Sequence, residues 1–215
     1  MADILKKIKD WEFTNKDSNV TLSLDYTELS EISDIVNRKI WLTSEFEDFT
    51  INSVIYTIFN YNAQDKGIPV EKRKPIILYI SSMGGNSYNA LGLISAIKAS
   101  ITPVYTVVTS YALSNALVVS VIGTKRYCFP NSIYLMHDGS IAAIDSTNKV
   151  RDLITFETGA MEDRYKNIIL NHTSLTKKQY DDKYRKEWYF FPEEAKKYGF
   201  VDYIVGQDCD IDEIL

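Results

Sequence analysis

The stretch that decides the fold is SSMGGN at residues 81–86, which follows directly on the apolar run PIILYI at residues 75–80. The run is apolar on both faces, which is typical of a strand in a parallel sheet. The two adjacent glycines permit positive φ angles and let backbone N–H groups approach another group closely. The stretch therefore predicts a sharp strand-to-helix turn, either a plain turn or part of a functional site.

Outward from this turn, predicted strands and helices alternate along the chain. Short apolar runs rich in β-branched residues predict strands, and apolar residues at helical spacing predict helices. This alternation favours an α/β fold. The expected strands cover residues 20–26, 38–43, 75–81, 103–109, 126–129, 133–137 and 200–205, and the expected helices cover residues 3–9, 50–63, 86–100, 113–123, 150–171, 175–186 and 192–199.

Composition indicates one globular domain. The chain has 215 residues, of which 45% are hydrophobic, and no Pro/Gly/Ser-rich linker divides it. We expect a domain over residues 35–215 and an N-terminal segment over residues 1–34, which could be an axial or propeptide-like extension. The net charge of −5 gives no general attraction to nucleic acid or to an anionic membrane. Neither is expected as a partner.

The expected location is the cytoplasm. The N-terminal sequence MADILKKIKDWEF has no apolar core of the kind found in secretory signals. The one long apolar window, residues 102–123, contains too many Ser, Thr and Asn residues for a membrane span. Cys128 and Cys209 are far apart and show no metal-ligand spacing. We predict no metal and no cofactor.

The glycines alone do not identify a site. Gly84, Gly85 and Gly92 do not form the G-x-G-x-x-G pattern of a dinucleotide-binding turn, and the chain contains no G-K-[ST] phosphate loop. A plain turn therefore stays open as an interpretation.

A serine and a histidine are the candidate catalytic pair. Ser114 lies where the strand over 103–109 turns into an apolar helix, and the unpaired N–H groups of a helix start can stabilise an oxyanion. Ser114 could equally be a helix N-cap. His137 ends a strand, at the edge where α/β sites assemble. His172, at the end of the long helix, is expected to be structural. The G-x-S-x-G motif of α/β-hydrolases is absent.

Several motifs in one order resemble the family of Clp protease proteolytic subunits, the ClpP family. They are YISSMGGNS, SYALSNALVVS and RYCFPNSIYLMHDGS, followed by IILNHTSLTKKQYDDKY and FFPEEAKKYGFVDYIV. The corresponding family patterns are a strand ending in Asn-Ser-Pro-Gly-Gly, a Gly-Gln-Ala-Ala-Ser-Met-Gly stretch, and Arg-Phe-Cys-Leu-Pro-Asn-Ser leading to Ile-His-Gln. The resemblance covers roughly residues 38–205.

The resemblance implies a crotonase-like spiral of ββα units with a long protruding helix, the handle, and a serine peptidase with a Ser-His-acid triad. By position, Ser114 matches the nucleophile, His137 the general base and Glu187 the acid. The backbone N–H groups of Gly85 and Asn115 match the oxyanion hole. The positions expected to bind substrate are Gly84, Gly139, Ser140 and Ile141.

The chain departs from the family pattern at several of these positions. The family has aspartate where this chain has Glu187, proline where it has Met83, and Met-Gly where it has Asn115 and Ala116. The family's glycine-rich segment after the histidine reads DGSIAAIDSTNK here, and its Arg-Asp pair at the ring interface reads Lys186-Glu187.

The resemblance also implies partners. These are unfolded polypeptide substrates, a ring of identical subunits (a heptamer or a tetradecamer), and a separate AAA+ ATPase, since the chain has no Walker motif. The alternatives are a non-catalytic or weakly active ring subunit, a phage- or plasmid-type homologue with a maturation role, and a crotonase-type acyl-CoA enzyme.

Overall fold

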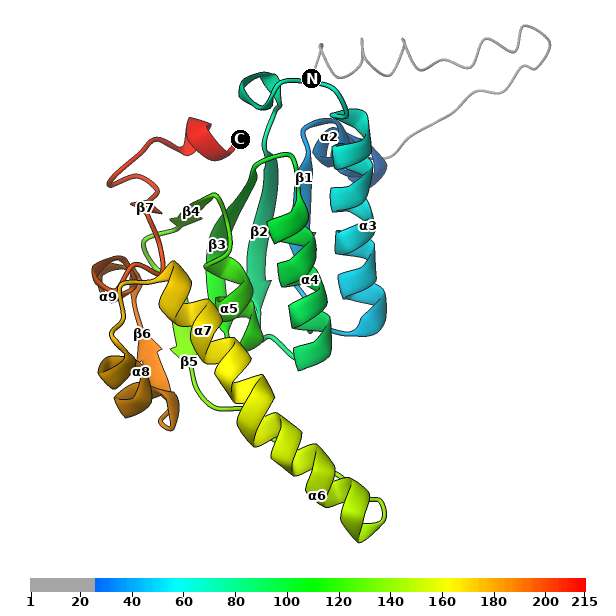
Figure 1. Ribbon diagram of the computed structural model, residues 1–215. Helices are drawn as coiled ribbons and strands as arrows, with labels where there is room; N and C mark the ends of the chain where they lie inside the picture. The colour runs from blue at the N-terminus through cyan, green and yellow to red at the C-terminus, as the bar shows by residue number, and fades with distance from the viewer. Residues whose placement is uncertain (1–25) are drawn as a thin grey trace, which may run out of the picture.

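The computed structural model describes residues 26–215, in which helices pack on a largely parallel sheet (Figure 1). The expected helix over 3–9 and almost all of the expected strand over 20–26 lie outside these residues. The elements are α2 Tyr26–Val36, β1 Lys39–Leu42, α3 Asp48–Gln64, η1 Val70–Lys72, β2 Ile76–Ser82, α4 Ser87–Ala99, β3 Val104–Leu113, α5 Asn115–Ser120, β4 Lys125–Cys128, β5 Ile133–Met136, α6 Thr147–Phe156, η2 Glu157–Met161, α7 Glu162–His172, α8 Lys177–Tyr184, β6 Trp188–Phe190, α9 Pro192–Lys197, β7 Tyr203–Ile204 and η3 Ile211–Ile214.

The sheet has the strand order β1-β2-β3-β4-β7, and β3 also pairs with β5, which in turn pairs with β6. All pairs are parallel except β5–β6. The long strand β3 pairs with β4 through residues 105–108 and with β5 through residues 111–113. The carboxyl end of β3 therefore lies beside the carboxyl end of β2 on one side, where Ser82 pairs with Ala112, and beside that of β5 on the other, where Leu113 pairs with Leu135.

Alternation along the strands divides the core between the two faces of the sheet. Ile76, Leu78 and Ile80 of β2 join the main cluster beneath the helices, whereas Ile77 and Tyr79 join a smaller cluster on the opposite face. The C-terminal segment covers part of that smaller cluster, since the Tyr79 hydroxyl bonds to the Ile214 carbonyl. The α/β fold with a parallel sheet is as expected.

The expected long helix forms the handle, which consists of α6, the π-helical segment η2 and α7. In Figure 1 the end of α6 protrudes well beyond the body of the molecule. The C-terminal half packs on the core through Met161, Ile168 and Ile169, all of them buried. No helix within residues 26–215 is long and apolar enough to cross a membrane.

Several boundaries differ from the sequence expectations. The helix expected over 113–123 is shorter, because β3 runs on to Leu113 and α5 ends at Ser120. The last expected strand is only Tyr203–Ile204. Four elements were not expected. They are the strand β6, the short 3-10 helices η1 and η3, and the helix α2, which crosses the boundary drawn at residue 35. The three residues of β6 are too few to show a periodicity.

Candidate active site

Ser114 occupies the turn between β3 and α5 in a strained conformation. Its φ of 55° and ψ of −126° are unusual for a residue with a side chain. It lies at the N-cap position, yet its hydroxyl makes no capping hydrogen bond. The backbone is held by the sheet, because Ser114 N donates to the carbonyl of Leu135 in β5 at 3.0 Å. Capping therefore does not account for the serine, and its hydroxyl has no hydrogen-bond partner within residues 26–215.

Strand register explains why three residues distant in sequence lie at the same edge of the sheet. Leu113 pairs with Leu135 in the parallel β3–β5 ladder, so Ser114 and His137 both leave the sheet at the same edge. Met136 pairs with Trp188 in the antiparallel β5–β6 ladder. The next pair outward is His137 and Glu187, and side chains opposite each other in such a pair lie within contact distance.

The histidine contacts the glutamate directly. His137 Nδ1 lies 3.0 Å from Glu187 Oε1. The carboxylate can only accept, so Nδ1 donates the proton and Nε2 of the neutral ring is left as an acceptor. The Glu187 side chain is 61% exposed and so remains well solvated. Within the part of the chain that the structure describes, the Ser114 hydroxyl makes no hydrogen bond to the ring.

The two glycines have different positions in the turn. A Cβ on Gly84 would lie 2.7 Å from the carbonyl oxygen of Leu113 and 2.8 Å from the backbone nitrogen of Asn115, so Gly84 packs against the turn that holds the serine. Gly85 has a φ of 135° and bridges to Phe46. A Cβ there would lie 2.8 Å from the nitrogen of Phe46.

The bridge leaves the N–H of Gly85 available. Phe46 N donates to Gly84 O at 2.7 Å and Asn86 N donates to Phe46 O at 3.2 Å, so the bridge uses the residues on either side of Gly85. The Gly85 N–H has no partner among the described residues. The Asn115 N–H is also free of the helix ladder, because it opens α5. Both N–H groups can donate to a ligand oxygen.

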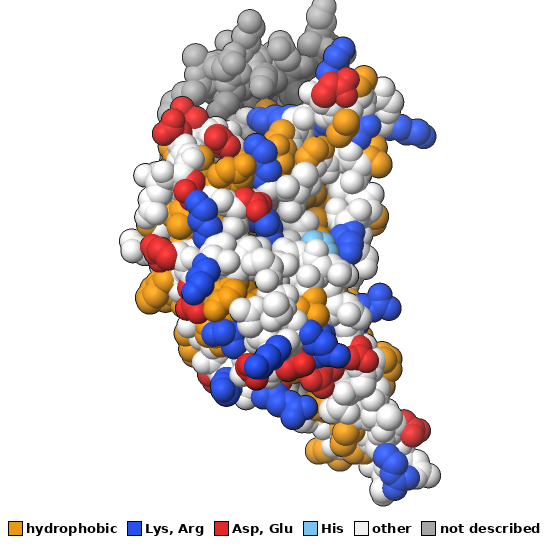
Figure 2. All heavy atoms as spheres, turned by 60° about the vertical axis from the view of Figure 1, so that its left-hand side comes forward, with side chains coloured by type: hydrophobic (Ala, Val, Ile, Leu, Met, Phe, Trp, Pro, Cys, Tyr) orange, Lys and Arg blue, Asp and Glu red, His pale blue; other side chains and the backbone are white. Residues whose placement is uncertain are grey.

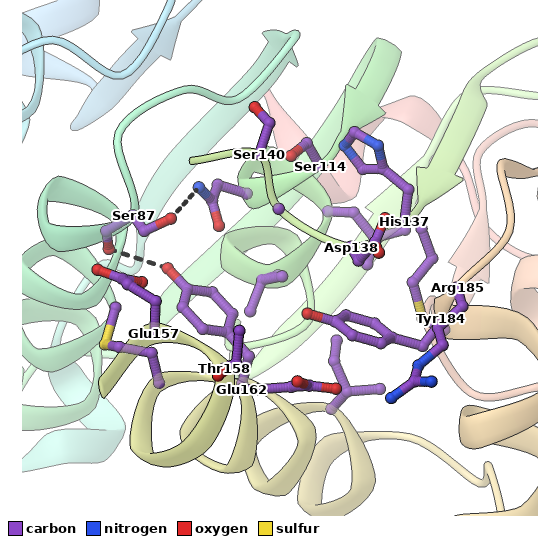
Figure 3. A pocket seen from close by; sticks show the side chains of 18 of the residues that line it. Ser87, Ser114, His137, Asp138, Ser140, Glu157, Thr158, Glu162, Tyr184 and Arg185 are labelled. Atoms are coloured by element: carbon purple, nitrogen blue, oxygen red, sulfur yellow. Dashed lines mark hydrogen bonds between the residues drawn. The ribbon is translucent and has the colours of Figure 1, made fainter. Parts of the chain in front are cut away.

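A cavity of about 490 Å³ adjoins the serine and histidine. In Figure 3, Ser114, His137 and Ser140 lie at one end of it, and Glu157, Thr158 and Glu162 of the handle lie at the other. Tyr165 and Tyr184 also line it, and burial raises the pKa of each to about 12. Both phenols stay protonated at neutral pH. Tyr165 donates its proton to the Ser87 carbonyl at 2.9 Å, whereas Tyr184 can donate to a ligand.

The other predicted positions divide between the cavity and the scaffold. Gly139, Ser140 and Ile141 line the cavity, as does Asn115, whereas Gly84 and Gly85 do not. His172 Nδ1 donates to the Ile168 carbonyl at 2.7 Å, which agrees with a structural role.

Two features of the site were missed by sequence reasoning. The Asn115 side chain donates to the Gly85 carbonyl at 2.6 Å, and Glu157 and Glu162 face the cavity from the handle. No sequence signal marks the asparagine contact, since it joins residues 30 positions apart. The helical spacing of the handle residues could have placed Glu157, Met161 and Tyr165 on one face.

Comparison with known proteins shows the family of the chain. Three similar proteins are all named ATP-dependent Clp protease proteolytic subunit. That of Streptococcus pyogenes serotype M5 is 28% identical, over 79% of this chain and 85% of its own length. That of Streptococcus uberis is 26% identical, over 79% of this chain and 85% of its own length. That of Deinococcus radiodurans is 25% identical, over 80% of this chain and 81% of its own length. The sequence model of the family described as Clp protease matches residues 26–208, and the chain therefore belongs to the Clp protease family, as a serine peptidase of the Clp type.

Proposed function

We propose that the protein is an endopeptidase that cleaves unfolded polypeptides with Ser114 as nucleophile, His137 as general base and Glu187 as the acid that orients the histidine. The observation that carries the proposal is the 3.0 Å contact between His137 Nδ1 and Glu187 Oε1, at the sheet edge from which Ser114 also emerges. A serine hydroxyl is a weak nucleophile until a base accepts its proton.

The reaction follows from these positions. Ser114 Oγ attacks the scissile carbonyl while its proton passes to His137 Nε2, and the oxyanion accepts hydrogen bonds from the N–H groups of Gly85 and Asn115. Each such donor typically stabilises the transition state by roughly 3 kcal/mol. The histidine then protonates the leaving amine. Water, deprotonated by the same ring, releases the acyl group and restores the serine.

The serine and the histidine must form their hydrogen bond when substrate binds. Catalytic hydrogen bonds that are absent in a free enzyme commonly form only in the Michaelis complex. A substrate side chain in the adjoining cavity would hold the scissile carbonyl against the Gly85 turn. Gly139, Ser140 and Ile141 belong to this substrate-binding surface, and Gly84 supports it from behind.

The decisive test is active-site labelling. We expect a fluorophosphonate to modify Ser114 of the wild type, and Ser114→Ala to abolish both labelling and peptide hydrolysis without unfolding the protein. A triad member carries several orders of magnitude in rate. Intact mass and peptide mapping identify the modified residue. If the Ser114→Ala protein still hydrolyses peptide esters at the wild-type rate, Ser114 is not the nucleophile.

The proposal includes a ring and a separate ATPase. The relatives are named as ATP-dependent, whereas this chain has no Walker motif, so ATP-driven unfolding would come from another chain. We propose a heptamer or a double heptamer with the active sites inside, located in the cytoplasm. Two results would support the ring and the separate ATPase. The protein should degrade a folded substrate only when an AAA+ ATPase and ATP are added, and it should degrade an unfolded substrate without either. The relatives' names do not favour a non-catalytic subunit.

A further inference from the structure

We infer that the side chain of Asn115 is a positioning residue that holds the two donors of the oxyanion hole in place relative to each other. The inference rests on the proposed peptidase function. It concerns the side-chain amide of Asn115, whereas the oxyanion itself would be bound by the backbone N–H of the same residue.

The two donors come from separate segments. Gly85 lies in the turn after β2, and Asn115 opens the helix after β3. Two N–H groups stabilise one oxygen only if they converge on it within a few tenths of an ångström. Gly85 has no side chain and an unusual φ of 135°, so its own conformational preferences do not hold it in this orientation. Something must fix the turn.

The Asn115 amide supplies that contact. Its Nδ2 donates to the Gly85 carbonyl at 2.6 Å and lies 3.3 Å from the hydroxyl of Ser87. Asn115 is only 8% exposed, so little water competes for these bonds. A single side chain thus connects the residue that carries one donor to the residue that carries the other.

The amide also restrains the chain on the C-terminal side of the Gly85 donor. Phe46 holds the glycine turn from one side through bonds to Gly84 and Asn86. Asn115 holds it from another side by donating to the carbonyl of Gly85, which lies in the peptide group that follows the Gly85 donor. The Gly85 N–H itself, in the preceding peptide group, has no partner among the described residues. Without the amide, the peptide after Gly85 would lose its hydrogen bond to the start of α5, and the Gly85 donor would be less tightly restrained relative to the Asn115 donor.

The contact continues to the handle. Ser87, whose hydroxyl meets the Asn115 amide, accepts a hydrogen bond at its carbonyl from the Tyr165 hydroxyl at 2.9 Å. Figure 3 shows both bonds as dashed lines that meet at Ser87. The first turn of α4 therefore lies between the oxyanion hole and the handle, and Asn115 is the point at which this hydrogen-bonded chain reaches the reacting centre.

The test uses Asn115→Leu, which keeps the shape and removes the donor, and Asn115→Asp, which puts an acceptor there. We expect Asn115→Leu to lower kcat about tenfold to a hundredfold with KM changed less than about twofold, because the oxyanion forms only in the transition state. Asn115→Asp should lower kcat further, because its carboxylate and the Gly85 carbonyl are both hydrogen-bond acceptors and would repel each other.

Inhibitor binding separates positioning from folding. A peptide boronic acid forms a tetrahedral adduct with the serine and should lose affinity for Asn115→Leu by the same factor as kcat. A cleaved peptide product, which makes no oxyanion, should bind unchanged. The matched control is Asn62→Leu, since Asn62 also joins distant segments by its amide but at the opposite end of the sheet. It should lower the Tm and leave kcat unaltered.

Two results would overturn the inference while leaving the peptidase intact. One is wild-type kcat and boronate affinity in Asn115→Leu. The other is a fall in boronate and product affinity by equal factors, which would mark a purely structural role. A wild-type protein that no fluorophosphonate labels would instead remove the proposed function and the inference with it.

Discussion

At the scale of single residues, Ser114 combines a reactive group with a backbone conformation that few residues adopt. Its φ of 55° and ψ of −126° place the Cβ in an unfavourable position, and the pairing of β3 with β5, together with the hydrogen bond from Ser114 N to the Leu135 carbonyl, keeps it there. Strain of this kind costs of order 1–3 kcal/mol and is commonly found at functional sites. The conformation turns the hydroxyl away from the capping position that a serine at a helix start would normally take.

This strain predicts an order of stability between two inactive variants. Ser114→Gly should be more stable than Ser114→Ala by about 1 kcal/mol, because glycine adopts a positive φ without steric cost. Urea unfolding of both variants measures the difference. The control pair is Ser120→Gly and Ser120→Ala in α5, where the helical backbone should make alanine the more stable residue. Equal stability of the two Ser114 variants would show that the turn is unstrained.

Glu187 contacts the histidine through one oxygen and is otherwise exposed to solvent. We expect Glu187→Gln to lower kcat by at least about a hundredfold with little change in KM, because the amide would favour the wrong tautomer of His137. Steady-state kinetics on a short peptide measures this, with the exposed Glu193→Gln as control. Unchanged kcat would transfer the role to another carboxylate or to none. Asp181 is a poor substitute, because it pairs with Lys166.

At the scale of elements, an ion pair between the buried Asp65 and the partly buried Arg38 connects the end of α3 to the amino ends of the strands. Arg38, just before β1, donates to both oxygens of Asp65 at 2.6 and 2.7 Å, and Thr102 donates to the same carboxylate at 2.6 Å. The hydrogen bond from Arg38 lowers the pKa of Asp65 and outweighs the opposing effect of burial. Removing one partner of such a pair costs about 3–5 kcal/mol.

The lowered pKa predicts how stability depends on pH. Because the pKa of Asp65 is lower in the folded than in the unfolded chain, its contribution is complete above the unfolded value near 3.9 and is lost as the pH falls through the folded value. Asp65→Asn should therefore be destabilised at pH 7, and its difference from wild type should shrink in acid. Urea unfolding from pH 7 to pH 3 measures this, with the exposed Asp182→Asn as control. A difference independent of pH would contradict the assignment.

At the scale of the whole molecule, apolar side chains are left exposed on the handle and the segment before it. Figure 2 shows hydrophobic side chains on the protruding end of the molecule, and charges of both signs over the rest of that face. Ile141, Ile144, Ile154 and Phe156 are exposed, whereas the handle's C-terminal half is buried in its own subunit. Exposed apolar surface of this extent is typical of an interaction surface.

We therefore expect the protein to assemble. Light scattering at micromolar concentration should give a mass of about seven or fourteen times the 24.7 kDa of one chain, since the proposed assembly is one or two heptameric rings. Phe156→Glu should lower that mass, because a charge would replace exposed apolar surface at the handle. A mass near 24.7 kDa that neither glycerol nor a peptide-like inhibitor changes would rule out the ring.

The sequence by itself determined the local features of this protein. The apolar run of β2, the glycines after it, Ser114 between a strand and a helix, and His137 at a strand end are each visible within a short window. Periodicity and turn chemistry act between neighbouring residues, so they can be read without the fold. The resemblance to the family motifs also pointed to Glu187 as the acid of the triad, by its position in the sequence.

Only the tertiary structure decided which of these residues meet. Glu187 contacts His137 because β6 pairs antiparallel with β5, and the three residues of β6 carry no pattern of their own. Asn115 reaches Gly85 because β2 and β3 run side by side and end together. Contacts of this kind depend on the register of strands that are distant in sequence, and register is set by burial of the whole sheet rather than by any local preference.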